Sequence, residues 1–138
     1  MLNQKISDEL INNLIAQAKC AANNAYAPFS KFKVGAALMT KSGKVYTGCN
    51  IENSSYGLTI CAERVAIFKA ISEGEREFIA MAIYNKEEKP YPCGACRQVM
   101  FEFNGGDMLV IIATDHSKDV LTLADLLPKG FKLAKTNC

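Results

Sequence analysis

Three cysteines and one glutamate in this chain have the types and spacing needed for metal-dependent hydrolysis. Cys61 and Glu63 are separated by one residue, and Cys93 and Cys96 form a C-x-x-C pair. A structural zinc ion normally has four protein ligands, whereas three leave its fourth position open for water. A carboxylate beside that position can move protons. The pattern therefore predicts hydrolytic chemistry at zinc, with Glu63 as the proton carrier.

The helices expected around these residues should help to hold the three sulfurs. Apolar spacing predicts helices over residues 61–72 and 93–103, so that Cys61 begins one helix and the C-x-x-C pair lies in the first turn of the next. The positive end of a helix lowers the pKa of a thiol and favours the thiolate that zinc binds. Arg64 is a candidate to offset the excess negative charge by hydrogen bonding to the sulfurs. A solvent-facing arginine is the alternative.

The other elements predict an α/β fold. Ser7 is a plausible N-cap for a helix that Pro28 closes. Apolar patterns predict four strands, and Leu121–Leu127 is either a short edge strand or a helix. Two strand–helix–strand units with apolar strands favour a three-layer α/β/α domain with a mixed sheet. The expected strands are residues 33–40 and 44–50, joined as a hairpin, then 78–84 and 108–114.

Composition argues against several classes of function. The 138 residues are 49% hydrophobic and 22% charged, and 16 basic against 14 acidic residues leave a net charge of +2. Nothing in the sequence resembles the basic stripe that binds a nucleic-acid backbone. The longest apolar run, residues 108–113, is far shorter than the roughly 20 residues that span a bilayer. We therefore expect neither a nucleic-acid partner nor a membrane.

The N-terminal residues lack the apolar stretch of a secretion signal, which predicts a cytoplasmic location. In a reducing compartment, clustered cysteines bind metal or do chemistry more often than they form disulfides. A thioredoxin-like redox site is one alternative, but it leaves Glu63 unexplained. A structural zinc site is another, and its fourth ligand would come from a residue with no matching local spacing: Cys20, Cys49, Cys138 or His116.

Several segments resemble those of a known family, the small homotetrameric cytidine deaminases of the cytidine/deoxycytidylate deaminase group. The similar segments, in the same order, are residues 26–37, 48–53, 61–64 and 92–98, followed by Leu126-Leu127-Pro128 and Phe131. The Cys-x-Glu and Pro-Cys-x-x-Cys pattern is itself typical of zinc deaminases. The resemblance implies one cytidine deaminase-like domain over residues 1–138, with a five-stranded mixed sheet.

The resemblance also implies a reaction and an assembly. The reaction would be zinc-dependent hydrolytic deamination of cytidine and 2′-deoxycytidine to uridine and 2′-deoxyuridine, which releases ammonia and serves pyrimidine salvage. The assembly would be a homotetramer whose active sites are completed by neighbouring subunits. The nucleoside would be a small-molecule partner, and Zn²⁺ the cofactor.

Roles for particular residues follow from the same resemblance. Zinc ligands would be Cys61, Cys93 and Cys96, and the proton carrier would be Glu63. Substrate contacts would come from Phe32 against the pyrimidine, Asn50 and Glu52 on the ribose hydroxyls, backbone groups of Ala62 and Cys93 at the base edge, Tyr56 at the subunit boundary, and Phe131 reaching into a neighbouring subunit. Arg64 and Gln98 would support the zinc ligands.

Elementary geometry supports part of this assignment. Side chains alternate along an extended chain, so Asn50 and Glu52 should point the same way as they leave a strand. An amide beside a carboxylate is a suitable clamp for a sugar hydroxyl. A loop-capping asparagine and a surface charge remain open as alternatives, Phe32 could equally belong to the core, and Phe131 to the core or an interface.

Two other functions are compatible with the zinc site. One is deamination of another cytosine-like compound, either a nucleoside antibiotic or a base in nucleic acid. The low net charge and the missing aromatic, basic groove argue against nucleic acid. The other is a zinc-stabilised binding module without activity, which does not explain why Glu63 is spaced for catalysis.

Overall fold

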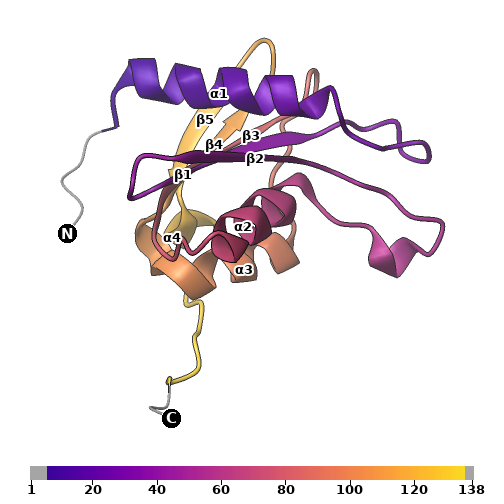
Figure 1. Ribbon diagram of the computed structural model, residues 1–138. Coiled ribbons are helices and arrows are strands. Elements are labelled where there is room, and N and C mark those ends of the chain that lie inside the picture. The colour runs from indigo at the N-terminus through magenta and orange to yellow at the C-terminus, as the bar shows by residue number, and fades with distance from the viewer. Residues whose placement is uncertain (1–5, 136–138) are drawn as a thin grey trace.

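A sheet with helices on both faces positions the candidate residues. The computed structural model describes residues 6–135, and its five-stranded mixed sheet has the strand order β2-β1-β3-β4-β5. Helix α1 covers one face, and α2, α3 and α4 lie on the other, so the predicted three-layer arrangement is confirmed (Figure 1). The elements are α1 (Asp8–Ala22), β1 (Gly35–Thr40), β2 (Val45–Cys49), the 3₁₀ helix η1 (Tyr56–Leu58), α2 (Ala62–Ser72), β3 (Phe78–Tyr84), α3 (Gly94–Asn104), the 3₁₀ helix η2 (Gly105–Asp107), β4 (Leu109–Ala113), β5 (Lys118–Thr122) and α4 (Leu123–Leu126).

The strand directions explain why the sheet is mixed. Strands β1 and β2 pair antiparallel as the predicted hairpin, β1 also pairs antiparallel with β3, and β5 pairs antiparallel with β4. In the part of the chain that the structure describes, β3 and β4 are the one parallel pair, and α3 connects them as a crossover helix. Strand β3 is almost wholly buried because it has α1 on one side and α2 and α3 on the other, which is why its sequence is a continuous apolar run.

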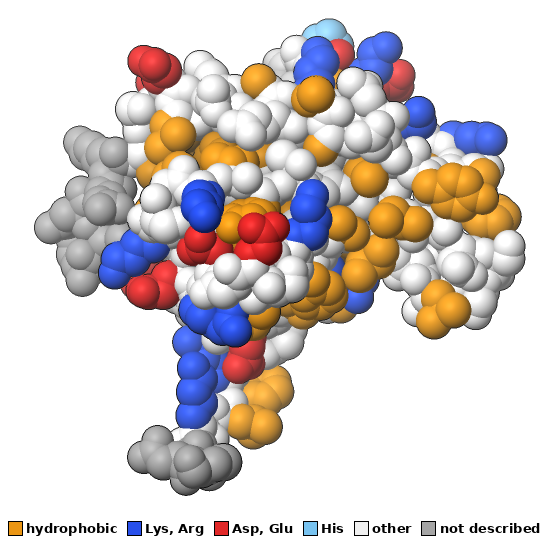
Figure 2. Space-filling view, in the orientation of Figure 1, with side chains coloured by type: hydrophobic (Ala, Val, Ile, Leu, Met, Phe, Trp, Pro, Cys, Tyr) orange, Lys and Arg blue, Asp and Glu red, His pale blue; other side chains and the backbone are white. Residues whose placement is uncertain are grey.

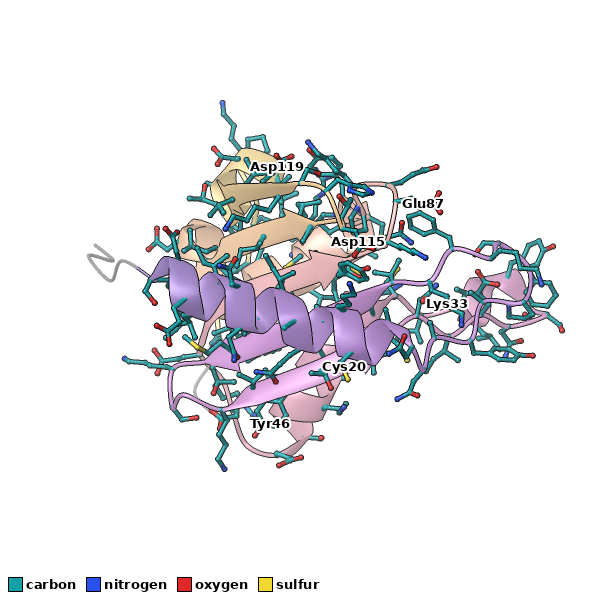
Figure 3. All side chains as sticks on the ribbon, turned by 90° about the horizontal axis from the view of Figure 1, so that it is seen from above. Cys20, Lys33, Tyr46, Glu87, Asp115 and Asp119 are labelled. Carbon is teal, nitrogen blue, oxygen red and sulfur yellow. The ribbon has the colours of Figure 1, made fainter. Side chains whose placement is uncertain are left out.

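Helix α1 begins where its cap predicts and lies across the sheet (Figure 3). The Ser7 side chain accepts a hydrogen bond from the backbone N–H of Leu10 at 3.1 Å. One face of the helix is buried, including Ile11, Leu14 and Ala18. Gly35 allows this close approach, because a Cβ atom there would lie 1.9 Å from the carbonyl oxygen of Ala18.

A second glycine brings the start of α2 against the sheet. A Cβ atom on Gly48 of β2 would lie 2.5 Å from the carbonyl oxygen of Ala62 and 2.7 Å from the backbone nitrogen of Ala66. Any side chain at this position would push the helix outward. The first turn of α2 carries Glu63, so Gly48 helps to place the candidate proton carrier.

The segment Leu121–Leu127, which the sequence left open between strand and helix, contains both. Strand β5 ends at Thr122, and the same residue caps α4 through a reciprocal pair of hydrogen bonds with Asp125. The N-terminal part of β5 is polar and lies at the sheet edge, so it carries no apolar signal. None of the helices within residues 6–135 is both long and apolar enough to cross a bilayer.

Candidate active site

The three cysteines of the metal prediction meet at the N-termini of two helices. Cys61 is the N-cap residue of α2, Cys93 is the N-cap residue of α3, and Cys96 lies in the first turn of α3. Their sulfur atoms all lie within 4.8 Å of one another, and Cys61 Sγ is 3.8 Å from Cys93 Sγ. Residues separated by 32 positions are therefore brought into one cluster.

This cluster fits a zinc ion. A tetrahedral zinc with Zn–S bonds of about 2.3 Å holds its sulfurs about 3.8 Å apart, which matches the distance between Cys61 and Cys93. Within residues 6–135, no fourth cysteine, histidine or carboxylate joins the cluster. Cys20 is exposed on α1, across the sheet (Figure 3), and His116 is exposed in a turn. Cys138, another candidate fourth ligand, lies outside the described residues.

Arg64 lies against the sulfurs instead of in solvent. Its guanidinium Nη2 donates a hydrogen bond to Cys61 Sγ at 3.5 Å. Hydrogen bonding from Cys96 first, and then from Arg64, lowers the pKa of the Cys61 thiol to about 5. Among the described residues, the buried Nε atom of Arg64 has no hydrogen-bond partner. The arginine therefore supplies positive charge where thiolates gather, as a zinc site with three sulfur ligands needs.

Glu63 is buried beside the cluster without belonging to it. It lies in the first turn of α2 and is only 4% exposed. Burial raises the pKa of its carboxyl group to about 7, and the negative charge of Cys61 acts in the same direction, against hydrogen bonding from the backbone. A carboxyl group with a pKa near neutrality can both accept and donate a proton at physiological pH. Glu63 thus has the acidity that a single proton carrier requires.

A cavity of about 430 Å³ opens onto these residues. Many of the predicted site residues line it together, although they come from four separate segments: Phe32, Asn50, Glu52, Cys61, Ala62, Glu63 and Cys93. Six further lining residues were not singled out from the sequence, namely Ser30, Val34, Thr59, Ile60, Pro90 and Tyr91. Ser30 and Val34 lie within the segment 26–37 that resembles the deaminases, and each of the other four is one or two residues from Cys61 or Pro92.

Asn50 and Glu52 both face the cavity, and both also hold its wall. Asn50 accepts a hydrogen bond from the backbone N–H of Val34 at 2.9 Å and donates one to the carbonyl oxygen of Phe32 at 2.8 Å. Glu52 Oε1 accepts hydrogen bonds from the backbone N–H groups of Phe29 and Ser30. Hydrogen bonding, led by the Ser30 hydroxyl, lowers the pKa of Glu52, so this carboxylate stays ionised.

Tyr56 and Phe131 are not among the residues that line the cavity of their own chain. Tyr56 is 77% exposed in η1 and makes an edge-on contact with Phe29, at 6.1 Å between ring centroids. Phe131 is 64% exposed, and its carbonyl oxygen accepts a hydrogen bond from the Gln98 side chain at 3.1 Å. Gln98 therefore contacts the C-terminal segment.

Comparisons with known proteins agree with this geometry. A family model described as the cytidine and deoxycytidylate deaminase zinc-binding region matches residues 8–113, which include all three clustered cysteines. A cytidine deaminase of Sporosarcina psychrophila is 52% identical over 124 residues, covering 88% of this chain and 90% of the relative. One from Halalkalibacterium halodurans is 48% identical, covering 90% and 96%. The crystal structure of cytidine deaminase from Burkholderia pseudomallei is 46% identical, with a TM-score of 0.84 over 91% of this chain and 100% of that chain.

Proposed function

Because the chain belongs to the cytidine and deoxycytidylate deaminase family, we propose that the cavity beside Cys61 binds a cytosine nucleoside and that Glu63 carries the protons of its deamination. The activity itself, hydrolytic deamination of cytidine, is that of close relatives covering most of the chain. The observation that carries the residue assignment is a buried carboxyl group that lines the cavity beside a three-thiol cluster without belonging to it.

The zinc ion of this family would be held by Cys61, Cys93 and Cys96. When bound, zinc lowers the pKa of a water molecule toward neutrality and so supplies a nucleophile. Arg64 would offset the excess negative charge of three thiolates through its hydrogen bond to Cys61. Because Glu63 lies outside the ligand cluster, it would remain free to move protons.

Glu63 would perform both proton transfers of the reaction. It accepts a proton from the attacking water and delivers it to N3 of cytosine, which makes C4 electrophilic. After water oxygen adds to C4, Glu63 passes the second proton to the amino group, which leaves as ammonia. Both transfers need the carboxyl group within about 2.6–3.2 Å of its partners.

The sugar end of the nucleoside would bind Asn50 and Glu52. The Asn50 amide still has one N–H and one lone pair after its two backbone contacts, and the carboxylate of Glu52 retains one of about four acceptor positions. A hydroxyl can donate to Glu52 while it accepts from Asn50. Such a clamp on the 3′-hydroxyl would accept cytidine and 2′-deoxycytidine alike, with Phe32 beside the pyrimidine.

Assembly and location are further parts of the proposal. A homotetramer is supported by the exposure of Tyr56 and Phe131, which would complete the active sites of neighbouring subunits. A cytoplasmic location is supported by the free thiols at Cys20 and Cys49 and in the cluster, which suit a reducing compartment.

The first test is the loss of ultraviolet absorbance when the zinc-loaded protein is mixed with cytidine. The Glu63→Gln variant should keep its zinc and fold, because neither depends on the carboxylate charge, and its kcat should fall by at least about a hundredfold. Metal analysis and circular dichroism establish zinc content and folding. Glu9→Gln, on the exposed side of α1, is the matched control and should retain full activity.

The two components of the proposal fail differently. Near wild-type turnover by Glu63→Gln would refute the proton-carrier assignment alone. A wild-type protein that is loaded with zinc and folded but leaves cytidine unchanged would instead favour the inactive binding module.

A further inference from the structure

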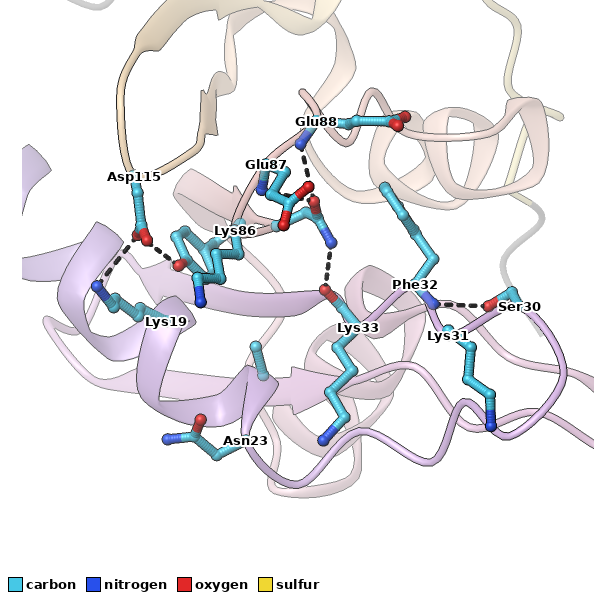
Figure 4. Close-up of a pocket in the computed structure, with 13 residues that line it drawn as sticks. Lys19, Asn23, Ser30, Lys31, Phe32, Lys33, Lys86, Glu87, Glu88 and Asp115 are labelled. Carbon is cyan, nitrogen blue, oxygen red and sulfur yellow. Dashed lines mark hydrogen bonds and ion pairs between the residues drawn. The ribbon is translucent and has the colours of Figure 1, made fainter.

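Residues Ser30 and Phe32 form a wall between two cavities. Both line the candidate active-site cavity, and both also line a second cavity of about 670 Å³ that extends toward the end of α1. Figure 4 shows the second cavity, with Ser30 and Phe32 joined by a hydrogen bond at one side. Because the wall borders a cavity on each side, close packing alone cannot fix its position. Its hydrogen bonds must therefore contribute strongly to holding the wall in position.

Ser30 is the residue through which these hydrogen bonds are connected. Its hydroxyl group donates a hydrogen bond to Glu52 Oε2. The Ser30 hydroxyl oxygen in turn accepts a hydrogen bond from the backbone N–H of Phe32 at 3.0 Å. The backbone N–H groups of Phe29 and Ser30 donate to Glu52 Oε1 at 2.8 and 3.2 Å. One hydroxyl group thus joins the carboxylate proposed to bind ribose to the ring proposed to face the base.

The backbone of this turn is held in an unusual conformation. Lys31, between Ser30 and Phe32, has a φ angle of +60°, in the left-handed region that residues other than glycine seldom adopt. The hydrogen bonds on either side of Lys31 offset the cost of this conformation. Without the Ser30 hydroxyl, the turn loses its contact with Glu52 Oε2 and its cap on the Phe32 N–H.

We infer that Ser30 is a positioning residue for the sugar end of the substrate. Its hydroxyl occupies one lone pair of Glu52 Oε2 and leaves the other to accept a hydrogen bond from the 3′-hydroxyl of the nucleoside. The same hydroxyl also fixes the distance between that carboxylate and Phe32. The inference rests on the proposed role of Glu52 in binding substrate. Ser30 acts through Glu52 and Phe32, so it affects binding more than chemistry at C4.

The test compares two substrates that differ only in the 3′-hydroxyl, 2′-deoxycytidine and 2′,3′-dideoxycytidine. In Ser30→Ala, KM for 2′-deoxycytidine should rise about tenfold or more, the lower end of what a hydrogen bond to a charged group is worth, while kcat changes less than about twofold. KM for the dideoxy analogue should change less than about twofold, because that substrate offers Glu52 no 3′-hydroxyl. Ser30→Thr keeps a hydroxyl and should restore the wild-type preference.

Two further variants separate the possible results. Ser72→Ala removes an exposed serine hydroxyl that bonds only within the end of α2, so it should leave both substrates unaffected. Glu52→Gln tests the role on which the inference rests. If Glu52→Gln keeps the preference for the 3′-hydroxyl, the ribose assignment falls and the role of Ser30 falls with it. If Glu52→Gln loses that preference, two results for Ser30→Ala overturn only the inference about Ser30. One is that Ser30→Ala keeps the preference, and the other is that it raises KM equally for both substrates.

Discussion

At the scale of single residues, the candidate metal centre joins groups that need one another. Three thiols crowd together at two helix N-termini, and the Arg64 guanidinium hydrogen-bonds to one of them. Crowded thiolates repel unless a cation lies among them, so the cluster is favourable mainly when metal binds. Glu63 is buried beside the sulfurs and feels their charge, but it does not belong to the cluster, so its carboxyl group is not needed as a ligand.

The Cys93→Ala variant tests this dependence. It removes one of three predicted ligands, and we expect it to lose most of its zinc and to unfold at a lower temperature than the zinc-loaded wild type. With a chelator present, the two proteins should melt at similar temperatures, because the mutated side chain is exposed at the start of α3. Cys20→Ala, at an exposed thiol on α1, is the control and should keep its zinc. Full zinc occupancy in Cys93→Ala would remove Cys93 from the ligand set.

Sequence reasoning reaches some site residues more easily than others. The cysteines and Glu63 have local spacings that reflect the chemistry of a zinc site, so they could be singled out directly. The link between Ser30 and Glu52 joins residues separated by 22 positions through one hydroxyl group, and no local pattern announces it. Likewise, the backbone contacts of Asn50 and Glu52 depend on how the hairpin places residues 29–34 and could not be predicted.

At the scale of elements, one polar network connects helix α1 to the ends of two strands. The Tyr84 hydroxyl, at the end of β3, donates to Asp115 Oδ1 at 2.5 Å, and Lys19 near the end of α1 contacts the same oxygen at 3.1 Å (Figure 4). Asp115 follows β4, so a single carboxylate joins three elements. Lys19 also lies in the last turn of α1, where a cation complements the helix dipole.

This network predicts a pH dependence of stability. Hydrogen bonding from Tyr84 first, and then from Lys19, lowers the pKa of Asp115 below its ordinary value of 3.8. The folded state therefore favours the ionised carboxylate, which contributes stability above pH 3.8 that is lost as the pH falls through the lower, folded-state pKa. Asp115→Asn cannot ionise, so its loss of stability relative to wild type should be largest near neutrality and should shrink in acid.

Urea denaturation at several pH values measures this difference. Asp107→Asn, which changes an exposed carboxylate in η2, provides the control. A loss of stability in Asp115→Asn that stays constant from neutral pH into strong acid would contradict an ionised Asp115 as its source.

Elements could be predicted from the sequence where a strand is buried on both faces, or where a capping residue directly precedes an amphipathic helix. Helix α1 has an apolar face and a serine cap, and β3 is buried on both faces, so each has a clear pattern. Strand β5 differs because its first residues, Lys118 and Asp119, are polar at the sheet edge, where pairing with β4 decides the structure. The sheet order was not available from local pattern either, because it depends on pairing between distant strands.

At the scale of the whole molecule, apolar side chains gather where none of residues 6–135 covers them. Figure 2 shows several on the arm that projects from one side of the sheet, which includes η1. The exposed apolar residues of this region are Tyr26, Phe29, Ile51, Tyr56 and Leu58. A second group, Phe131 and Leu133, lies on the C-terminal segment, which leaves the body of the molecule (Figure 1). Exposed apolar groups on projecting segments suit an interaction surface, and most soluble oligomers are symmetric assemblies of one chain.

The proposed sharing of active sites between subunits predicts complementation between two chains of reduced activity. Phe131→Ala should lower activity because its ring would be missing from neighbouring sites, and Glu63→Gln lacks the proton carrier in its own site. When the two variants are co-expressed with different tags and purified as mixed oligomers, some sites combine Glu63 from one chain with Phe131 from the other. Their activity should exceed that of an equal mixture of the separate variants, while light scattering reports a tetramer. Equal activities, or a monomer that is fully active, would contradict the shared site.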